Sequence, residues 1–217
     1  MNDKVDTSDE WLKHYQDPVE SKRRKAVLES KLEMLGVFLL DKHAKILDLC
    51  CGNLEVMEIL QERGYTSIIG VDQTLFRPDE IRFPVFKSDA TKLPFEDMSF
   101  DAVINVHAMH HLGDLDDLLV VLDQIHRVLR ADGKLFILDF VPSMKLKIIF
   151  FLFKNKILYF TRYMRHYADQ LILEEDIIDR YLSNYKQFMS LINFFFRRKN
   201  VKYDSWHIYL CLERIQN

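Results

Sequence analysis

The sequence predicts an α/β fold with a doubly wound parallel sheet, and the stretch Lys45–Asp72 gives the clearest reason. It reads as a strand, a tight turn, a helix and a second strand. We assign the apolar runs Ile46–Leu49 and Ser67–Val71 to the strands. Between them, three apolar residues recur at helical spacing ahead of Gly64, a usual helix terminator: Val56, Ile59 and Leu60. Two buried strands joined by a crossover helix imply a right-handed parallel unit.

An acidic residue marks the end of each of these strands. Asp48 lies near the end of the first strand, and Asp72 directly follows the second. Ligands of such sheets bind beyond the carboxyl ends of the strands, and a carboxylate about 20 residues after the turn glycine can accept from the hydroxyls of a ribose. A dinucleotide site would need G-x-G-x-x-G, because pyrophosphate requires bare backbone and a helix N-terminus. Since Gly52 is the only glycine of the turn Cys50–Leu54, a nucleoside site is favoured.

Composition narrows the class of protein. At 217 residues, with 48% hydrophobic and 29% charged residues, the chain is expected to form one globular domain. A net charge of −3 supplies no basic field, so we expect no nucleic-acid partner. Three cysteines make no disulfide framework. Because Met1–Glu10 is acidic and polar, unlike a signal peptide, a cytoplasmic location is expected.

The other elements are expected in chain order around the central unit. A helix should start at Asp17-Pro18-Val19-Glu20, a capping sequence, and present one apolar face formed by Leu28, Leu32 and Leu35. The connection Gln73–Pro84 is short and holds two prolines, so it should contain at most a turn or two near Arg77–Ile81. Asp114 should cap a helix that ends at Arg130-Ala131-Asp132-Gly133. The remaining expected strands are Val85–Lys87, Ala102–Val106, Leu135–Phe140, Phe194–Tyr203 and His207–Arg214.

Two motifs carry a resemblance to a known family. Asp48–Leu54, DLCCGNL, resembles motif I of class I S-adenosylmethionine-dependent methyltransferases, D-x-G-x-G-x-G; it keeps the acid and the middle glycine and has Cys50 and Leu54 at the outer glycine positions. Leu93–Asp101, LPFEDMSFD, is very close to the family's L-P-F-x-D-x-S-F-D and is the most specific match. The resemblance extends from Lys45 to Phe140. It is that of the small-molecule, type 11-like group with a degenerate motif I.

This resemblance implies a Rossmann-like, doubly wound seven-stranded sheet, mostly parallel with an antiparallel C-terminal edge strand. A single methyltransferase domain would span 1–217, with a helical N-terminal cover at 1–43, a cofactor-binding core at 44–141, a helical lid at 142–192 and C-terminal strands at 193–217. The first helix would cover the cofactor with Tyr15 or Trp11, or else pack on the sheet edge.

The resemblance also assigns roles in binding S-adenosylmethionine. Asp48 would sit near the methionine ammonium, and Asp72 would hold the ribose. Gln73 would lie against the adenine, whose edge Asp89 and Ala90 would frame. The complete expected set of cofactor-binding residues is Asp48, Cys50, Cys51, Gly52, Asp72, Gln73, Asp89, Ala90, Asn105 and Tyr15. Leu54 would either crowd the methionine or point into the core.

The segment Met144–Arg165 mixes aromatic residues with lysines and arginines. Its longest apolar run, Ile148–Phe153, is far shorter than the roughly 20 residues that span a bilayer, so no stable membrane insertion is expected. The family often has a helical lid here, and an aromatic lid would suit an apolar or planar small-molecule acceptor. A core-facing helix with basic flanks and an interfacial helix on a membrane surface are the alternatives.

Three histidines follow the fourth expected strand: His107, His110 and His111. Metal sites usually need ligands from more than one element, and no Cys or Glu partner is in obvious reach, so we expect no metal. His110 or His107 is the better candidate for a general base; otherwise both are loop residues near the cofactor. The pair Cys50-Cys51 admits a redox or arsenical role, but its place in motif I favours the cofactor turn.

The function expected from these features is S-adenosylmethionine-dependent methylation of a small molecule at oxygen, nitrogen or carbon. Asn105-Val106-His107-Ala108 stands where an N-P-P-Y-like motif would mark amide methylation, which argues against the nucleic-acid and glutamine amide group. Two alternatives stay open: a non-catalytic binding or scaffold protein, and an enzyme that uses the sulfonium for other chemistry.

Overall fold

The computed structural model describes residues 18–74, 82–112 and 114–216, and all statements below concern these residues. The expectations for Trp11, Tyr15 and Arg77–Ile81 lie outside the described residues. The helices are α2 (Pro18–Leu35), α3 (Glu55–Glu62), α4 (Leu115–Val128), α5 (Met144–Lys154), α6 (Arg162–Leu173), α7 (Glu175–Ser183) and α8 (Tyr185–Phe195), with 3-10 turns η1 (Val37–Leu39) and η3 (Met109–His111). The strands are β1 (Lys45–Leu49), β2 (Ser67–Asp72), β3 (Val85–Lys87), β4 (Phe100–Val106), β5 (Leu129–Phe140), β6 (Phe196–Tyr203) and β7 (His207–Arg214).

The strands form one seven-stranded sheet in the order β3-β2-β1-β4-β5-β7-β6. β1 to β5 are parallel, and β7 pairs antiparallel with both β5 and β6. The expected fold class is therefore confirmed. In this sheet β7 lies one place in from the edge that β6 forms, so the reversal of direction is buried between two neighbours.

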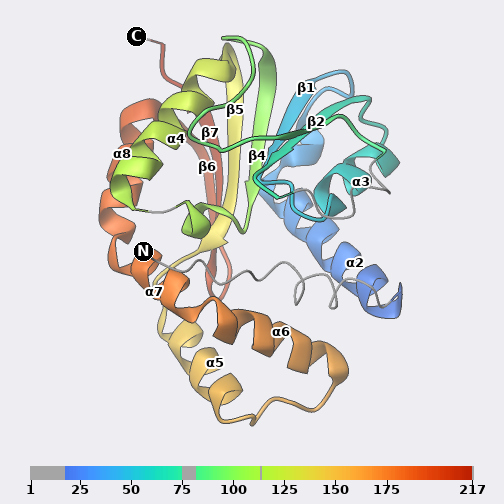
Figure 1. The fold of residues 1–217 in the computed structure, drawn as a ribbon, viewed down its shortest axis with the longest axis vertical. Coiled ribbons are helices and arrows are strands. Elements are labelled where there is room, and N and C mark those ends of the chain that lie inside the picture. Colours follow the sequence, from blue (N-terminus) through green and yellow to red (C-terminus); the bar gives the residue numbers. More distant parts are fainter. Residues whose placement is uncertain (1–17, 75–81, 113, 217) are drawn as a thin grey trace.

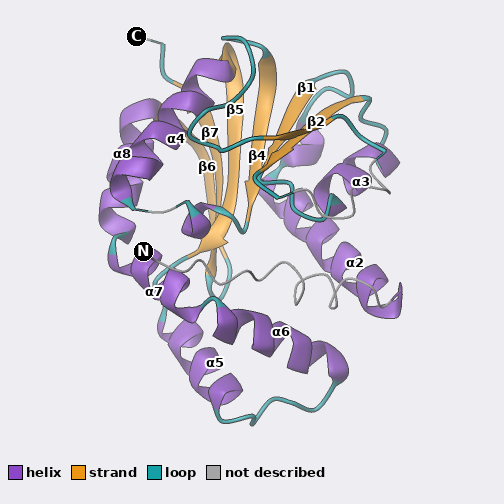
Figure 2. Ribbon diagram, viewed as in Figure 1, coloured by secondary structure: helices purple, strands orange, loops and turns teal. Residues whose placement is uncertain are grey.

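Helices cover both faces of the sheet and its carboxyl end. In Figure 1, α2 and α3 lie on one face, α4 and α8 lie on the other, and α5, α6 and α7 extend beyond the ends of the strands. Figure 2 shows the same layers by element type. Most of α8 falls within the segment 142–192 expected to form a lid, but its side chains Phe188 and Ile192 are buried in the core beside α4. The helices that project past the sheet are α5 to α7.

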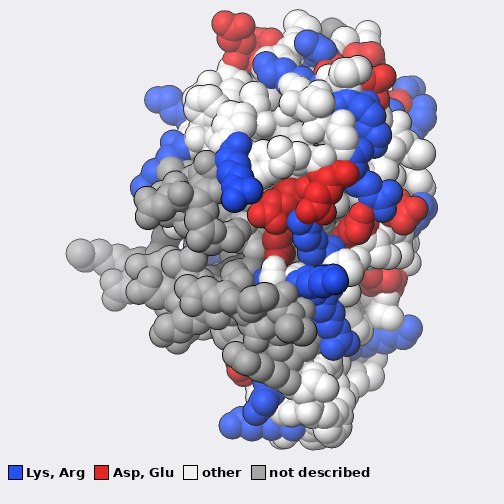
Figure 3. Space-filling model, turned by 90° about the vertical axis from the view of Figure 1, so that its right-hand side faces the viewer, with Lys and Arg blue, Asp and Glu red and all other residues white. Residues whose placement is uncertain are grey.

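α2 packs on α3 through an apolar face and a set of ion pairs. Leu32 and Leu35 are buried, as their spacing predicts. The outer rows of the two helices carry opposite charges, and the pairs are Arg24–Glu55, Lys25–Glu58, Lys25–Glu62 and Arg63–Glu29. Figure 3 shows acidic and basic side chains gathered together on this side of the molecule. Helix α2 is thereby fixed against the core next to the carboxyl edge of the sheet.

The boundary between α4 and β5 differs from the expectation. The helix ends at Val128 and the strand begins at Leu129, six residues earlier than Leu135. Leu129 pairs with Phe100 and Lys134 with Ala102, so the intervening residues bulge from the ladder. A Cβ on Gly133 would lie 2.9 Å from the carbonyl oxygen of Arg130, which explains why this bulge holds a glycine. The turn-like sequence Arg130–Gly133 therefore lies inside the strand rather than ahead of it.

Candidate functional site

The turn between β1 and α3 is hydrogen-bonded to the end of β2. The Gly52 amide donates to Asp72 Oδ2 at 2.9 Å, and the Cys51 amide donates to the Val71 carbonyl at 3.1 Å. A Cβ added to Gly52 would meet no atom within 4 Å, so the outer side of the turn has room for a ligand. The turn thus places backbone groups and the Asp72 carboxylate side by side at the carboxyl edge of the sheet.

The two residues that replace motif glycines keep the backbone conformation that glycine favours. Cys50 has φ 60° and Leu54 has φ 71°, both in the left-handed region, where a side chain costs about 1–2 kcal/mol. Leu54 is only 4% exposed and packs in the core cluster with Met57 and Leu60. Of the two expected placements of Leu54, the structure shows the one in which the side chain points into the core. The side chain therefore does not occupy the open side of the turn.

Asp48 and Asn105 are buried polar side chains on adjacent strands. Asp48 is 2% exposed, and its Oδ2 has no hydrogen-bond partner among the described residues. Burial, with a smaller contribution from the charge of Asp72, raises the pKa of Asp48 to about 8. Asn105 donates from Nδ2 to the Leu49 carbonyl at 3.0 Å, while its Oδ1 also has no partner among the described residues. Such acceptors suit a ligand that brings a cation or N–H donors.

The expected adenosine-binding side chains meet at the ends of β2 and β3. Asp72 Oδ1 accepts from the Thr74 amide at 2.8 Å, and burial raises the pKa of Asp72. Gln73 Nε2 donates to Asp89 Oδ2, and Asp89 Oδ1 accepts from the Thr91 amide at 2.8 Å. Ala90 is buried beside them. The structure therefore brings together every expected cofactor-binding residue that it describes, and Tyr15 lies outside the described range.

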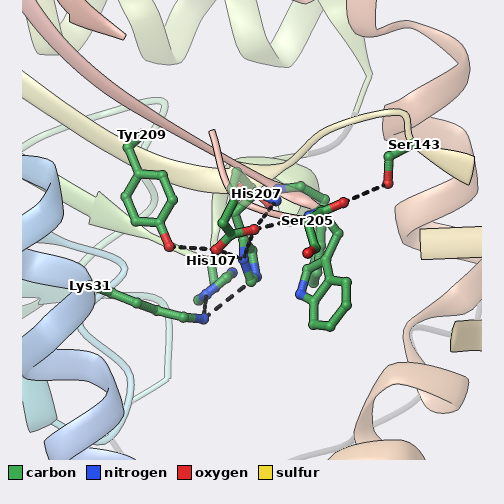
Figure 4. A network of polar contacts seen from close by, with 10 residues as sticks. Lys31, His107, Ser143, Ser205, His207 and Tyr209 are labelled. Atoms are coloured by element: carbon green, nitrogen blue, oxygen red, sulfur yellow. Dashed lines mark hydrogen bonds and ion pairs between the residues drawn. The ribbon is translucent and has the colours of Figure 1, made fainter. Parts of the chain in front are cut away.

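A second polar network lies just past β4 and β5 (Figure 4). Lys31 Nζ of α2 lies 3.1 Å from His107 Nε2 and 3.5 Å from His207 Nε2. His207 Nδ1 contacts Asp204 Oδ2 at 2.8 Å, and the Tyr209 hydroxyl donates to the same oxygen at 2.6 Å. Sequence reasoning identified only His107 of this network, because its other members come from α2 and the β6–β7 hairpin and share no local pattern.

In this network the amine of Lys31 lies close to the imidazoles of His107 and His207. Burial lowers the pKa of Lys31 to about 8, against the opposing charge of Asp204. Burial and then the Lys31 charge lower the pKa of His207 to about 4 and that of His107 well below its usual range. Burial opposes ionisation of Asp204, but hydrogen bonds from Tyr209, the Trp206 amide and His207 outweigh it and lower its pKa to about 2. Both imidazoles are neutral at pH 7, and Lys31 is the group whose charge changes near physiological pH.

His110 lies in a separate cluster with two carboxylates. Its Nδ1 is 2.7 Å from Asp139 Oδ1, and its Nε2 is 3.6 Å from Glu174 Oε2. His111 Nε2 lies 3.7 Å from the other Glu174 oxygen. Burial opposes protonation of His110, but Asp139 and Glu174 outweigh it and raise its pKa to about 9. The expectation that no Glu is in reach of these histidines is corrected, because the junction of α6 and α7 brings Glu174 to η3.

The arrangement defines a class of protein. A buried acid on β1, a glycine turn hydrogen-bonded to the acid that ends β2, and an acid after β3 lie at the carboxyl edge of a doubly wound sheet, where such sheets bind ligands. In agreement, a family model described as a methyltransferase domain matches residues 47–137. This chain has the fold of class I S-adenosylmethionine-dependent methyltransferases, and the part that matches the domain model carries both motifs that predicted it.

Known proteins similar to this chain act on different acceptors. The demethylmenaquinone methyltransferase of Thermus thermophilus is 31% identical over 113 residues, covering 46% of this chain and 49% of that protein. The tRNA (carboxymethyluridine(34)-5-O)-methyltransferase alkbh8 of Xenopus tropicalis is 30% identical over 105 residues, covering 46% of this chain and 16% of that protein. The chain thus spans about half or less of the length of these curated relatives.

A solved structure matches over most of this chain. It is the Burkholderia thailandensis 1,6-didemethyltoxoflavin-N1-methyltransferase with bound 1,6-didemethyltoxoflavin and S-adenosylhomocysteine, with a TM-score of 0.58 at 14% identity. The match covers 98% of this chain and 85% of that chain, so the likeness of fold includes the helices beyond the matched core. No helix in the described part of the chain is long and apolar enough to cross a membrane.

Proposed function

We propose that this protein transfers a methyl group from S-adenosylmethionine to a small acceptor that contains an apolar ring. The observation that carries the proposal is the hydrogen bond from the Gly52 amide to Asp72 Oδ2, beside the buried carboxyl of Asp48. This hydrogen bond joins the turn after β1 to the end of β2, and S-adenosylmethionine would contact both. An unpartnered, desolvated oxygen on Asp48 adds a site for the ammonium group of the same ligand.

The cofactor supplies a methyl group on a positively charged sulfur, so the protein needs no nucleophile of its own. Asp48 would accept from the ammonium, and the backbone of Cys50, Cys51 and Gly52 would contact the amino-acid part. Asp72 would keep an acceptor site for the ribose hydroxyls beyond those used by the neighbouring backbone amides. Gln73, Asp89 and Ala90 would frame the adenine. These groups hold the donor and exclude water, which is the main requirement of an in-line displacement.

The Lys31–His107 pair is the better source of a base for the acceptor's proton. His110, one of the two histidines predicted for this role, is buried with Nδ1 on Asp139 and Nε2 facing Glu174. Lys31 has a pKa of about 8, close to the working range of a general base. The bound cofactor would supply the methyl group, and Lys31 Nζ would take the acceptor's proton, with neutral His107 orienting the amine.

The surface of the helices beyond the sheet supports this acceptor class. Large apolar side chains on α5 and the segment after it face outward, among them Met144, Phe151 and Phe160. An apolar surface of this kind suits an aromatic ring, and two of the similar proteins are named for menaquinone and toxoflavin precursors. RNA is less well supported, because Arg197 and Lys199 on edge strand β6 are both paired with Glu213.

Calorimetric titration with S-adenosylhomocysteine tests the cofactor site directly. Asp72→Ala should abolish micromolar binding, whereas Asp132→Ala, an exposed acid far along the chain, should bind like the wild type. If the wild type binds neither S-adenosylmethionine nor S-adenosylhomocysteine, the proposed enzymatic function is overturned and a non-catalytic binding protein is favoured. If binding is found, demethylated quinones and unmodified tRNA, each incubated with radiolabelled donor, will separate the two acceptor classes.

A further inference from the structure

We propose that His110, His111 and Glu174 form a binding site for one divalent transition-metal ion, with zinc as the best fit. The two imidazoles come from η3, directly after β4, and the carboxylate comes from the junction of α6 and α7. One ligand atom from each residue lies within 4.8 Å of the others. This proposal is independent of the proposed methyl transfer.

The spacing of the ligand atoms is close to that of a zinc site. Zinc binds imidazole nitrogen and carboxylate oxygen at about 2.0–2.2 Å, so ligand atoms of a tetrahedral site lie about 3.4 Å apart. Glu174 Oε2 lies 3.6 Å from His110 Nε2, and Glu174 Oε1 lies 3.7 Å from His111 Nε2. Those separations exceed a hydrogen bond, and the ligand atoms, which lie within 4.8 Å of one another, would contract by up to about 1.4 Å to hold an ion.

Two of the three residues are buried with atoms that lack a hydrogen-bond partner. His110 is 2% exposed and Glu174 is 8% exposed. Neither Nε2 of His110 nor Oε1 of Glu174 has a hydrogen-bond partner among the described residues. Both atoms belong to the cluster and are of the type that coordinates zinc. An ion between them would satisfy both at once, which explains polar atoms that burial otherwise makes unfavourable.

Asp139 supports the proposed site through Nδ1 of His110, the ring nitrogen that would not bind the metal. It contacts His110 Nδ1 at 2.7 Å and also accepts from the amides of His110 and Phe140. A histidine that binds a metal usually donates its other ring nitrogen to a carboxylate, which fixes the tautomer and strengthens the ligand. With the proton held on Nδ1 by Asp139, the lone pair of Nε2 points toward Glu174.

The competing explanation is a protonated His110 bridging Asp139 and Glu174 without any ion. That explanation leaves His111 without a role, although its Nε2 approaches the second Glu174 oxygen and its ring is tilted by 39° to that of His110 with centroids 4.3 Å apart.

An ion at this position would fasten α6 and α7 to the sheet. Glu174 lies between these helices, and η3 lies at the carboxyl end of β4, so the three ligands bridge the helices beyond the sheet and the core. Metal binding would therefore stabilise the position of α7 beside the site. The expected sign is a rise in melting temperature on adding metal, with no requirement for cofactor.

The experiment uses full-length protein without a histidine tag, stripped with a chelator and titrated with zinc against a chromogenic competitor. We expect one zinc per chain, and His111→Ala and Glu174→Gln should each weaken binding by at least about 100-fold and remove the melting-temperature rise. His43→Ala, which removes an exposed histidine outside the cluster, should change neither quantity. Asp139→Asn should weaken zinc by about 10- to 100-fold without changing the stoichiometry.

The free thiols of Cys50, Cys51 and Cys211 are the main competing ligands. Cobalt added in place of zinc separates the two sites, because thiolate coordination gives an intense near-ultraviolet charge-transfer band that nitrogen and oxygen ligands lack. Zinc binding that is unchanged in His111→Ala and Glu174→Gln, a cobalt–thiolate band, or no binding by the wild type would each overturn the proposal and leave an ion-paired His110.

Discussion

Replacing Asp48 by asparagine should stabilise the protein without ligand, and only at neutral to alkaline pH. The side chain is 2% exposed, and burial raises the pKa of its carboxyl from 3.8 to about 8 in the folded state. The folded protein therefore binds this proton more tightly than the unfolded chain does. The resulting contribution favours folding most below pH 4, declines as the pH rises from 4 to 8, and is constant above 8.

The size of the stability change follows from the difference between the pKa values of Asp48 in the folded and unfolded states. A pKa rise of this size corresponds to roughly 5–6 kcal/mol of lost stability at pH 8 and above. A domain of this kind is stable by about 5–15 kcal/mol, so the carboxylate consumes a large part of the total. Asparagine keeps the shape and carries no charge; it should raise the free energy of unfolding by several kcal/mol at pH 8.5 and by little at pH 4.5.

Urea unfolding of wild type and Asp48→Asn at pH 4.5, 6, 7 and 8.5 measures the difference, and the other titrating groups cancel between the two proteins. Asp132→Asn, an exposed aspartate, is the control and should run parallel to the wild type. Saturating S-adenosylhomocysteine should narrow the gap at pH 8.5, since its ammonium would pair with the carboxylate. If the stability difference between wild type and Asp48→Asn is the same at all four pH values, the reasoning is refuted.

Two further substitutions address the packing of the cofactor turn and the proposed base. Gly70→Ala would place a Cβ 2.8 Å from both Cys51 Sγ and Met57 Sδ, so it should cost about 1–3 kcal/mol of unfolding free energy and weaken S-adenosylhomocysteine binding through the displaced turn; an unchanged melting temperature would contradict this packing. Lys31→Met should lower kcat by about 10²- to 10⁴-fold and remove the rise of rate around pH 8, while the dissociation constant of S-adenosylhomocysteine stays the same. A variant that keeps the wild-type pH profile would exclude Lys31 as the base.

The central β1–α3–β2 unit was predictable because its signals are local. Apolar runs, helical spacing and the Gly64 terminator act over a few residues, and the right-handed crossover rule then fixes how the two strands lie. The positions of Asp48, Asp72 and Asp89 follow from that geometry, because each ends or follows a parallel strand. The start of β5 was not predictable in this way: Arg130–Gly133 looks like a turn locally but is held as a bulge by pairing with β4.

Local sequence signals predicted the fold class and the edge of the sheet proposed to bind the cofactor, because parallel strands that alternate with helices bring their carboxyl ends to one line. Long-range packing determines which further side chains lie at that edge. Lys31 and His207 are separated by 176 residues, yet they meet because α2 packs on the sheet and β7 enters antiparallel, with its first residue at the carboxyl edge. Glu174 reaches His110 and His111 because the helices after β5 fold back past the strand ends. Local sequence propensities cannot predict these contacts, because the contacts depend on long-range packing.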